Sequence, residues 1–337
     1  MHLYCIGIDY QSAPLEVREA ALRKRRQIVE FWRRYPLQRA SVLVTCNRIE
    51  VYAVGNDQSD SFLYRDLFLC SFTEFAQGYY VFGNSDVFSH ALRLACGLES
   101  QLKGELQIVD QLTQWRLQAD MSAELARFWT RVLAAALRIR QQSGLLKQEH
   151  TVASLVLNDI QEHIALSSDA SIVIAGTGKI AELFASHIAP FMRLSFAAHK
   201  NFAKAQALAA QAQGEALLFS QLPLALAKVD VLVSATTSPH FVVSKETVAS
   251  VCLKRSKPLY LYDLAVPRDI DPRVADLPNV VLRNLNDVFG QFDSYSNRLK
   301  STIEYAQHLV QQEVCAYAGE HNEEYSENWH QAGCACA

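Results

Sequence analysis

A glycine-rich turn, placed between an apolar run and a helical pattern, constrains the fold of this 337-residue chain more than any other feature. Residues 171–175 form a largely β-branched apolar run that predicts a buried strand, and Gly176-Thr177-Gly178-Lys179-Ile180-Ala181 follows at once. The hexamer fits the pattern G-x-G-x-x-G/A, whose glycines permit a tight turn and bring the backbone close to a pyrophosphate at a helix N-terminus. We therefore predict a dinucleotide-binding unit in which these six residues contact the cofactor.

Strands and helices alternate after this turn. Residues 180–188 and 202–212 have helical patterns, and residues 194–198, 229–235 and 259–263 are apolar runs typical of strands. Such alternation predicts a Rossmann-type, doubly wound parallel sheet. We place this domain at residues 151–288.

The type of dinucleotide is read at the end of the second predicted strand. An acidic residue there would bind the ribose 2′-hydroxyl of NAD, but this chain has His199-Lys200-Asn201. A cation without a carboxylate favours the 2′-phosphate of NADP, so Lys200 is the candidate phosphate contact and NADPH the expected cofactor. The alternative is that Lys200 is a solvated loop lysine.

The first 150 residues have a different pattern, which predicts an α+β domain. Residues 3–8, 41–44 and 49–54 predict strands, residues 16–35 have a helical pattern, and the pattern becomes helical again from residue 86. Within residues 119–142, a stripe of apolar residues recurs at helical spacing and predicts a side that faces the core. Its members are Leu125, Phe128, Trp129, Val132, Leu133 and Leu137.

A cysteine lies in the short connection between the strands predicted at 41–44 and 49–54. Cys46 is two residues from Arg48, and a nearby cation favours the thiolate, the form that attacks carbonyl carbon. A thiolate together with a nicotinamide suits one reaction: an activated carboxyl group forms a thioester, and hydride reduces that thioester to an aldehyde. The alternative is a buried, inert cysteine.

The histidines and the other cysteines give one further candidate and no metal site. His90, at the start of an apparent helix, could move protons, although a lone histidine is more often structural. The eight cysteines include no C-x-x-C pair and no C…H set with zinc spacing, so we expect no metal. Cys334 and Cys336 lie in an acidic, apolar-poor tail, residues 319–337, for which we predict disorder.

The net charge of −3 excludes an overall basic footprint, so nucleic-acid binding would need a local basic face. One segment offers such a face, and a solvated helix surface is the alternative reading. Its residues are Arg23, Lys24, Arg25, Arg26, Arg33 and Arg34, with Trp32 and Tyr35 interleaved. The chain has no apolar stretch of about 18 residues and no evident signal peptide, so we expect no membrane span and a cytoplasmic location.

A long helix is predicted from about residue 286, and we assign residues 289–318 to it as a third region. Leu299, Ile303, Ala306 and Val310 form a stripe that must be covered. We expect the helix to pack partly against the catalytic domain of its own chain. The residues after Tyr317 are mostly polar and acidic, so any homodimer should be weak.

Five motifs, in order along residues 3–315, resemble those of the glutamyl-tRNA reductase family. They are A-P-L-E-V-R-E at 13–19, T-C-N-R-I-E-V-Y at 45–52, G-L-E-S at 97–100 with G-E-L-Q-I at 104–108, S-A-T-T-S-P at 234–239 and D-L-A-V-P-R-D at 263–269. This chain departs from the family pattern at Asp9-Tyr10, commonly Asn-His, at Leu106, commonly Pro, and at His199-Lys200-Asn201, commonly Asn-Arg-Thr. Family members usually continue into a helical dimerisation domain, of which we expect only the first helix in this sequence.

The resemblance implies an α/β enzyme with an α+β N-terminal catalytic domain at residues 1–150, a Rossmann-type NADPH domain and a long C-terminal helix. Its activity would be NADPH-dependent reduction of glutamyl-tRNA to glutamate-1-semialdehyde, the first step of five-carbon tetrapyrrole synthesis, which leads to haem. Cys46 would attack the ester and expel the tRNA, His90 would lie near it, and Arg48 would clamp a substrate carboxylate. The implied substrate-binding residues are Thr45, Asn47, Arg48, Ser100, Glu105 and Gln107.

The resemblance also implies partners, and it leaves two other functions open. Glutamyl-tRNA is the implied partner, and the downstream glutamate-1-semialdehyde aminotransferase could take the aldehyde directly. One alternative function is binding of tRNA or haem without catalysis, by a relative that keeps the fold. A thiol-dependent reductase of free thioesters is the other.

Overall fold

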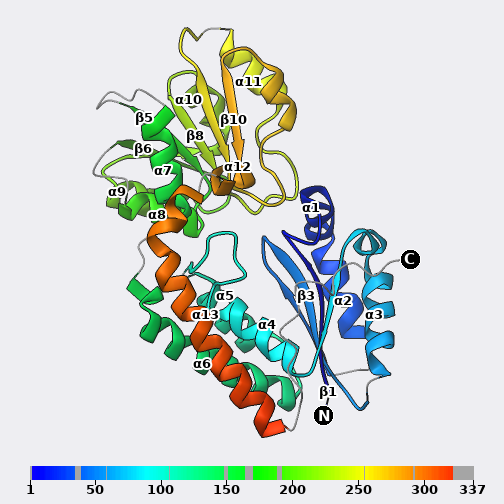
Figure 1. The fold of residues 1–337 in the computed structure, drawn as a ribbon. Coiled ribbons are helices and arrows are strands. Elements are labelled where there is room, and N and C mark those ends of the chain that lie inside the picture. The colour runs from blue at the N-terminus through cyan, green and yellow to red at the C-terminus, as the bar shows by residue number, and fades with distance from the viewer. Residues whose placement is uncertain are drawn as a thin grey trace. The chain divides into compact units, whose positions relative to one another are not determined.

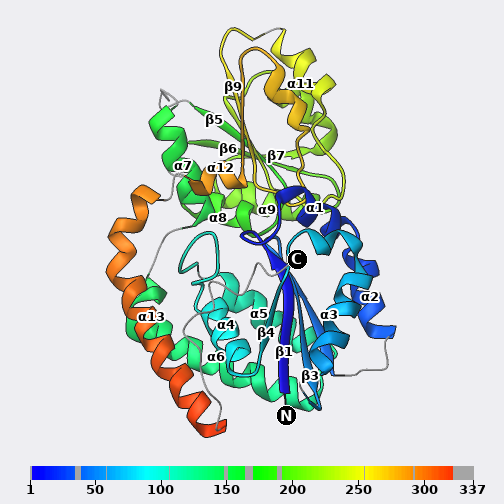
Figure 2. The same cartoon turned by 45° about the vertical axis from the view of Figure 1, so that its right-hand side comes forward.

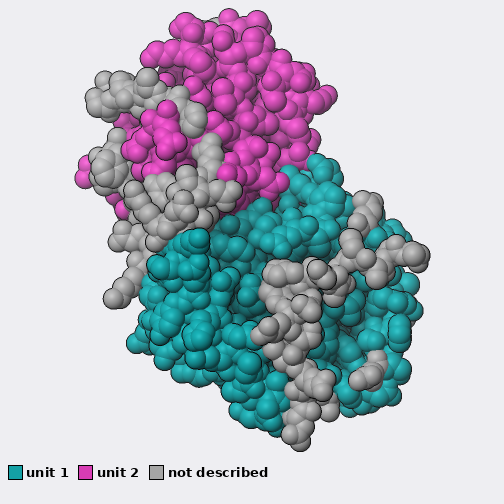
Figure 3. Space-filling model, viewed as in Figure 1, with its two compact units in different colours: residues 1–149, 296–337 teal, residues 150–295 magenta. Residues whose placement is uncertain are grey.

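The computed structural model describes residues 2–34, 39–57, 59–105, 107–147, 151–163, 170–187, 192–253, 255–290 and 293–321. The chain divides into two compact units, one of residues 1–149 and 296–337 and the other of residues 150–295 (Figure 3). Four residues singled out from the sequence lie outside the described ranges: Tyr35, Leu106, Cys334 and Cys336. Most of the predicted tail lies outside them too.

The first unit is built on a four-stranded antiparallel sheet of order β2-β3-β1-β4. Its strands are β1 (His2–Asp9), β2 (Ala40–Val44), β3 (Arg48–Gly55) and β4 (Tyr80–Gly83). The three strands predicted from the sequence are confirmed, and β4 is the short strand that the pattern did not single out. Because β2 is an edge strand, one of its backbone edges is available to other groups.

Helices cover both faces of this sheet, as Figure 2 shows. The helices are α1 (Leu15–Arg23), α2 (Arg25–Arg34), α3 (Asp60–Ser71), α4 (Ser85–Ala95), α5 (Gln107–Gln118) and α6 (Ala123–Ser143). Successive residues of β1 point to opposite faces. Tyr4 contacts Tyr64 of α3, whereas Cys5 packs in the core formed with α4, α5 and α6.

The described part of the helical segment predicted at 16–35 is helical and forms two helices, α1 and α2, since residues 23–27 contain no apolar side chain that would bury a continuous face. One residue of the stripe predicted on α6 is wrong. Leu137 is 47% exposed, although the other five residues of its predicted stripe are buried. Toward the C-terminal end of α6, the buried face includes Ile139 and Arg140 but not Leu137.

The second unit contains a six-stranded parallel sheet of order β10-β9-β8-β5-β6-β7, which confirms the doubly wound prediction. Its strands are β5 (Ser171–Ala175), β6 (Arg193–Ala198), β7 (Glu215–Leu218), β8 (Val231–Ser234), β9 (Leu259–Asp263) and β10 (Val280–Asn284). The order reverses at β5, whose two neighbours, β6 and β8, both follow it in sequence. Ligands of open α/β sheets bind at the carboxyl ends of the strands beside such a switch point.

The helices of the second unit are α7 (Val152–His163), α8 (Lys179–His187), α9 (Phe202–Gln211), α10 (Leu222–Leu226), α11 (Lys245–Cys252) and α12 (Leu285–Gly290). The edge strands β7 and β10 were not singled out by the sequence pattern. They are only four and five residues long, and none of their residues is fully buried, so their apolar signal is weak.

The long C-terminal helix, α13 (Asp293–His321), packs along the helices of the first unit (Figure 1). Ala306 and Val310 are buried in the core that contains α4 and α6, and Tyr317 stacks on Phe88 with ring centroids 3.9 Å apart. Arg131 donates to Glu320 at 2.6 Å. The prediction that this helix packs partly against the N-terminal domain of its own chain is therefore confirmed.

No helix within the described ranges combines the length and the apolar character needed to cross a membrane.

Candidate active site

Cys46 lies at the tip of the hairpin between β2 and β3. The backbone N–H of Thr45 donates to the carbonyl of Arg48 at 2.9 Å and closes the loop. The N–H of Asn47 donates to Thr45 Oγ1 at 3.2 Å, which restrains the tip further. The Cys46 side chain reaches solvent, so it is not one of the core cysteines.

The thiol of Cys46 is not activated by its surroundings. Desolvation by neighbouring protein atoms, and then the carboxyl of Glu105, raise the pKa of the thiol to about 11, although the side chain reaches solvent. Arg18 and Arg48 both lower this pKa, but by less. Arg48 therefore acts in the predicted direction, but the lowered pKa that the sequence suggested is not found.

Arg48 has a weak effect on the thiol because its charge is shared with acidic partners. Its Nη1 donates to Glu50 Oε1 at 2.7 Å and lies 4.0 Å from Asp9 Oδ2. Its Nη2 donates to the carbonyl of Glu99 at 2.6 Å. The side chain is 2% exposed, so this arrangement fixes the guanidinium in one position.

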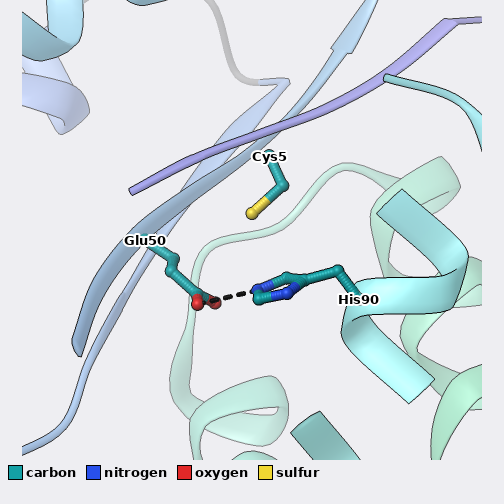
Figure 4. A group of neighbouring side chains, drawn as sticks. All are labelled: Cys5, Glu50 and His90. Carbon is teal, nitrogen blue, oxygen red and sulfur yellow. Dashed lines mark hydrogen bonds and ion pairs between the residues drawn. The ribbon is translucent and has the colours of Figure 1, made fainter. Parts of the chain in front are cut away.

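Glu50 also contacts a buried histidine, His90 (Figure 4). Its Oε1 accepts from Arg48 and from Tyr80 at 2.6 Å and lies 2.9 Å from His90 Nε2, and its Oε2 accepts from Tyr52 at 2.7 Å. Burial alone would raise the pKa of this carboxyl, but Arg48 and the His90 and Tyr80 contacts hold it well below its usual range. Glu50 is therefore a buried carboxylate that orients its donors.

His90 lies in the middle of α4, not at the start of a helix as the sequence suggested. Besides Glu50, its ring contacts the rings of Tyr80 and Phe82. Among the described residues, these contacts orient His90 toward the Glu50 cluster, and none joins it to Cys46. Cys5 Sγ completes a group in which one atom each from Cys5, Glu50 and His90 lie within 4.8 Å of one another.

This Cys5, Glu50 and His90 group has ligand types that metals use, but its geometry is that of a hydrogen-bond network. Glu50 already accepts from three donors besides His90, one of them the cation of Arg48. Burial raises the pKa of the Cys5 thiol well above its usual value, and the carboxylate of Glu50 adds to that effect. A thiol that stays protonated is a poor metal ligand.

The remaining substrate candidates lie on the segment between α4 and α5. Ser100 is buried and donates to the carboxyl of Glu105, whose pKa burial raises. Gln107 is the first residue of α5. Arg140 of α6, fully buried, donates to the carbonyls of Cys96 and Gly104 at 2.8 and 2.9 Å, which holds this segment in place.

Sequence reasoning missed Glu50 and Arg140. For Glu50 a signal existed: Arg48, Glu50 and Tyr52 alternate along β3 and so point to one face of a strand that reads as buried. Charged residues at alternate positions on a buried face must be paired with one another or with groups facing them. For Arg140 no local signal existed, because its acceptors are carbonyls from a segment about 40 residues away.

The glycine-rich turn has the form that a pyrophosphate site requires. Gly176 follows β5 with φ of 118°, and an added Cβ would lie 2.5 Å from the carbonyl oxygen of Ala235. At Gly178 an added Cβ would meet no atom within 4 Å, so the space above the turn is open. The helix α8 begins at Lys179, and Ala181 is buried, so Ala181 packs the helix onto the sheet.

Lys200 lies in the turn that follows β6 and is exposed. Asn201 accepts from the backbone N–H of Lys204 at 3.3 Å and so caps α9. The turn 199–201 contains no carboxylate that would oppose a phosphate. The residues of this turn and of the glycine-rich turn therefore fit a phosphorylated dinucleotide.

A Rossmann-type sheet with an open phosphate turn, in a chain whose other unit presents a thiol on a hairpin, defines the chain as an oxidoreductase that uses a nicotinamide dinucleotide. The glutamyl-tRNAGlu reductase N-terminal domain family matches residues 6–143, and the shikimate / quinate 5-dehydrogenase family matches residues 158–290.

Glutamyl-tRNA reductase of Thermus thermophilus is 34% identical, over 85% of this chain and 72% of that protein. That of Carboxydothermus hydrogenoformans is 28% identical, over 96% of this chain and 76% of that protein. The solved structure of glutamyl-tRNA reductase from Methanopyrus kandleri has 25% identity and a TM-score of 0.49, over 94% of this chain and 80% of that one. The chain belongs to the glutamyl-tRNA reductase family, which confirms the resemblance seen in the sequence.

Proposed function

We propose that this chain reduces glutamyl-tRNA to glutamate-1-semialdehyde with NADPH, through a thioester on Cys46, in the first step of five-carbon tetrapyrrole synthesis. The observation that carries the proposal is the exposed Cys46 thiol, held on a restrained hairpin tip next to Arg48 and Glu105. Family membership supports the choice of substrate. A cytoplasmic location fits the free thiols of the described cysteines.

The first chemical step is attack of the Cys46 thiolate on the ester carbonyl. The carbon–sulfur bond forms, the bond to the terminal ribose oxygen breaks, and the departing ribose hydroxyl takes up a proton. A thiol with a pKa of about 11 is rarely ionised at neutral pH. The α-ammonium group of the substrate would lower the pKa of the Cys46 thiol, because a cation beside Glu105 would neutralise the carboxylate charge that raises this pKa.

The thioester is then reduced to the aldehyde. NADPH, when bound, supplies hydride to the thioester carbonyl carbon, and the carbon–sulfur bond breaks to return the cysteine. Arg48, held by Glu50 and by the carbonyl of Glu99, offers a fixed positive charge near the substrate carboxylate. His90, oriented by Glu50, is the candidate proton carrier of this site.

The cofactor would be held by the turn from Gly176 to Ala181 and by Lys200. The open space at Gly178 accommodates the pyrophosphate, with the first N–H groups of α8 directed at it. Lys200 offers a cation to the 2′-phosphate. Thr177, Lys179 and Ile180 line the same turn.

Two partners follow from this function. The aldehyde product is reactive, so direct transfer to a glutamate-1-semialdehyde aminotransferase would protect it. A homodimer would be weak, because Ala306 and Val310 of the α13 stripe are already buried in the core of the chain's own first unit.

Single-turnover product analysis with glutamyl-tRNA and NADPH tests the proposal. Cys46→Ala should abolish both the captured thioester and the aldehyde, while the fold persists, because the exposed side chain contributes little to the core. Cys70→Ala is the matched control, since Cys70 is another exposed cysteine of the same unit. Substantial aldehyde formation by Cys46→Ala would exclude the thioester mechanism.

A further inference from the structure

A cavity of about 650 Å³ in the first unit is lined at one end by Thr45 and Cys46. Its walls come from α2, from the edge strand β2 and from α5. This volume lies within the range of about 300–1,000 Å³ that small ligands occupy in proteins. The glutamyl-binding candidates Arg48 and Ser100 do not line it, so the proposed chemistry leaves the cavity unassigned.

The α5 wall presents a row of amides. Gln111, Gln114 and Gln118 line the cavity, and their spacing of three and four residues places them on one face of the helix. All three are exposed. Amides both donate and accept hydrogen bonds without carrying charge, which suits the edge of a nucleobase or a ribose hydroxyl better than a phosphate.

An aromatic ring lies within this row. Trp115 lines the cavity and is half-buried, and its Nε1 donates to the carbonyl of Val42 in β2 at 2.7 Å. That bond fixes the indole against the edge strand. A rigid aromatic ring beside amides is a typical platform for an unstacked base.

Helix α2 adds an indole N–H group and a positive charge to the lining of the cavity. Trp32 lines the cavity and is 4% exposed, and its Nε1 is buried with no hydrogen-bond partner among the described residues. A buried N–H without an acceptor is costly and marks a position where a ligand could supply one. Arg33, also in the lining, is exposed and belongs to the basic segment of the chain that includes residues 23–26.

We propose that this cavity binds the 3′-terminal adenosine of the charged tRNA. The inference rests on the proposed function, because it assigns the leaving group of that reaction. The carbonyl carbon that Cys46 attacks has a glutamyl group on one side and a ribose oxygen on the other. Arg48 and Ser100 lie on the glutamyl side, and the cavity that runs from Cys46 along β2 takes the nucleoside.

Two small esters separate this subsite from the chemistry. Glutamyl-adenosine, esterified at the ribose, carries the nucleoside, whereas the α-ethyl ester of glutamate does not. The measured quantity is the second-order rate of Cys46 acylation, followed as a mass increase of the peptide that contains Cys46, because other cysteines are also exposed. Wild-type protein should react with both esters and faster with glutamyl-adenosine.

The double variant Gln111→Ala/Gln114→Ala should lower the rate with glutamyl-adenosine about tenfold, the order expected for two lost hydrogen bonds. Its rate with the ethyl ester should stay at the wild-type value. Leu117→Ala is the matched control, because Leu117 is 66% exposed on α5 and does not line the cavity. It should change neither rate.

Each other outcome counts against a specific claim. Equal losses on both esters would assign the glutamines to the glutamyl side and overturn the subsite. Unchanged rates on both would show that the cavity does not hold the nucleoside. If wild-type protein is acylated by neither ester nor by glutamyl-tRNA, the proposed function itself fails, and the subsite fails with it.

Discussion

The candidate sites of the two units are built in opposite ways. In the second unit the phosphate turn consists of backbone and small residues, with Gly176 in a left-handed conformation and open space at Gly178. In the first unit Cys46 lies two residues before Arg48, a buried side chain that is paired with the buried carboxylate of Glu50. The phosphate turn depends on the absence of side-chain atoms at its glycines, whereas the site of the first unit depends on each buried charge having a partner.

This difference implies opposite sensitivities. A backbone site should tolerate changes of charge but not added volume. An ionic cluster should tolerate small changes of volume but not the loss of one charge, because the remaining partner is then buried and uncompensated. Each of the following substitutions tests one side of this contrast.

The largest effect is expected from Glu50→Ala. The change leaves Arg48 buried without its ion pair and removes the acceptor of Tyr52, Tyr80 and His90. Breaking a buried pair on one side costs about 3–5 kcal/mol, so the free energy of unfolding in urea should fall by that amount and reductase activity should be lost.

Asp66→Ala is the matched control for this measurement. It breaks an exposed ion pair with Arg65, for which about 0–1 kcal/mol is expected. If Glu50→Ala proves no more destabilising than Asp66→Ala, the cluster does not depend on charge pairing, and the contrast between the units disappears.

The next effect separates two glycines of the same turn. Gly176→Ala should destabilise the second unit even without cofactor, because its Cβ would lie 2.5 Å from the carbonyl of Ala235 and its φ is 118°. Gly178→Ala should leave the unit stable, since its Cβ meets nothing within 4 Å, yet it should weaken NADPH and NADH equally, by about tenfold.

Thermal unfolding without cofactor and fluorescence titration with each nucleotide measure the two effects. Normal cofactor affinity in Gly178→Ala would mean that the pyrophosphate does not approach this part of the turn. A stable Gly176→Ala protein would show that the backbone can relax around the added methyl group.

The same contrast explains how much the sequence could predict. The phosphate turn is local: a strand, two glycines and a helix within about 15 residues, so its pattern specified both the fold and the place of Gly176. The hairpin that carries Cys46 was equally local, and its strands were predicted close to their observed ends.

The ionic cluster could not be read in the same way, because its members come from segments far apart. Glu50 and His90 are 40 residues apart and meet only when α4 packs on the sheet. The pKa of Cys46 likewise depends on burial and on Glu105, which approaches only in the folded unit, so proximity to Arg48 in the sequence did not give the direction of the net shift. Charge balance in a folded site is a property of all its neighbours.

A smaller effect is expected from Glu105→Gln. The carboxyl of Glu105 is the charge that most raises the pKa of the Cys46 thiol, so its neutral amide should lower that pKa from about 11. At a fixed pH near 8 more thiolate would then be present, and Cys46 alkylation by iodoacetamide should accelerate, by up to about tenfold for each unit of pKa.

Glu124→Gln, a change in the same unit at a side chain that is 42% exposed, provides the control and should leave the alkylation rate unchanged. The rate must be measured at Cys46 by peptide mass, because other cysteines are also exposed. An unchanged rate in Glu105→Gln would show that Glu105 is already protonated, and that desolvation alone raises the thiol's pKa.

The smallest effect is expected from Lys200→Ala, because this side chain is exposed and water screens its charge. Affinity for NADPH should fall several-fold and affinity for NADH should not change, since only NADPH carries the 2′-phosphate. Lys228→Ala is the matched control. Lys228 is also exposed, but it precedes β8, whereas Lys200 follows β6. In a parallel sheet Lys228 therefore lies at the amino ends of the strands and Lys200 at their carboxyl ends.

Lys200→Arg sharpens the test further. An arginine keeps the charge and can grip a phosphate with two N–H groups, so the preference for NADPH should be kept or strengthened. Equal losses for NADPH and NADH in Lys200→Ala would show that the lysine supports the turn and does not bind the phosphate. In that case the second unit would bind its cofactor through backbone alone, and the contrast with the ionic first unit would be sharper than proposed.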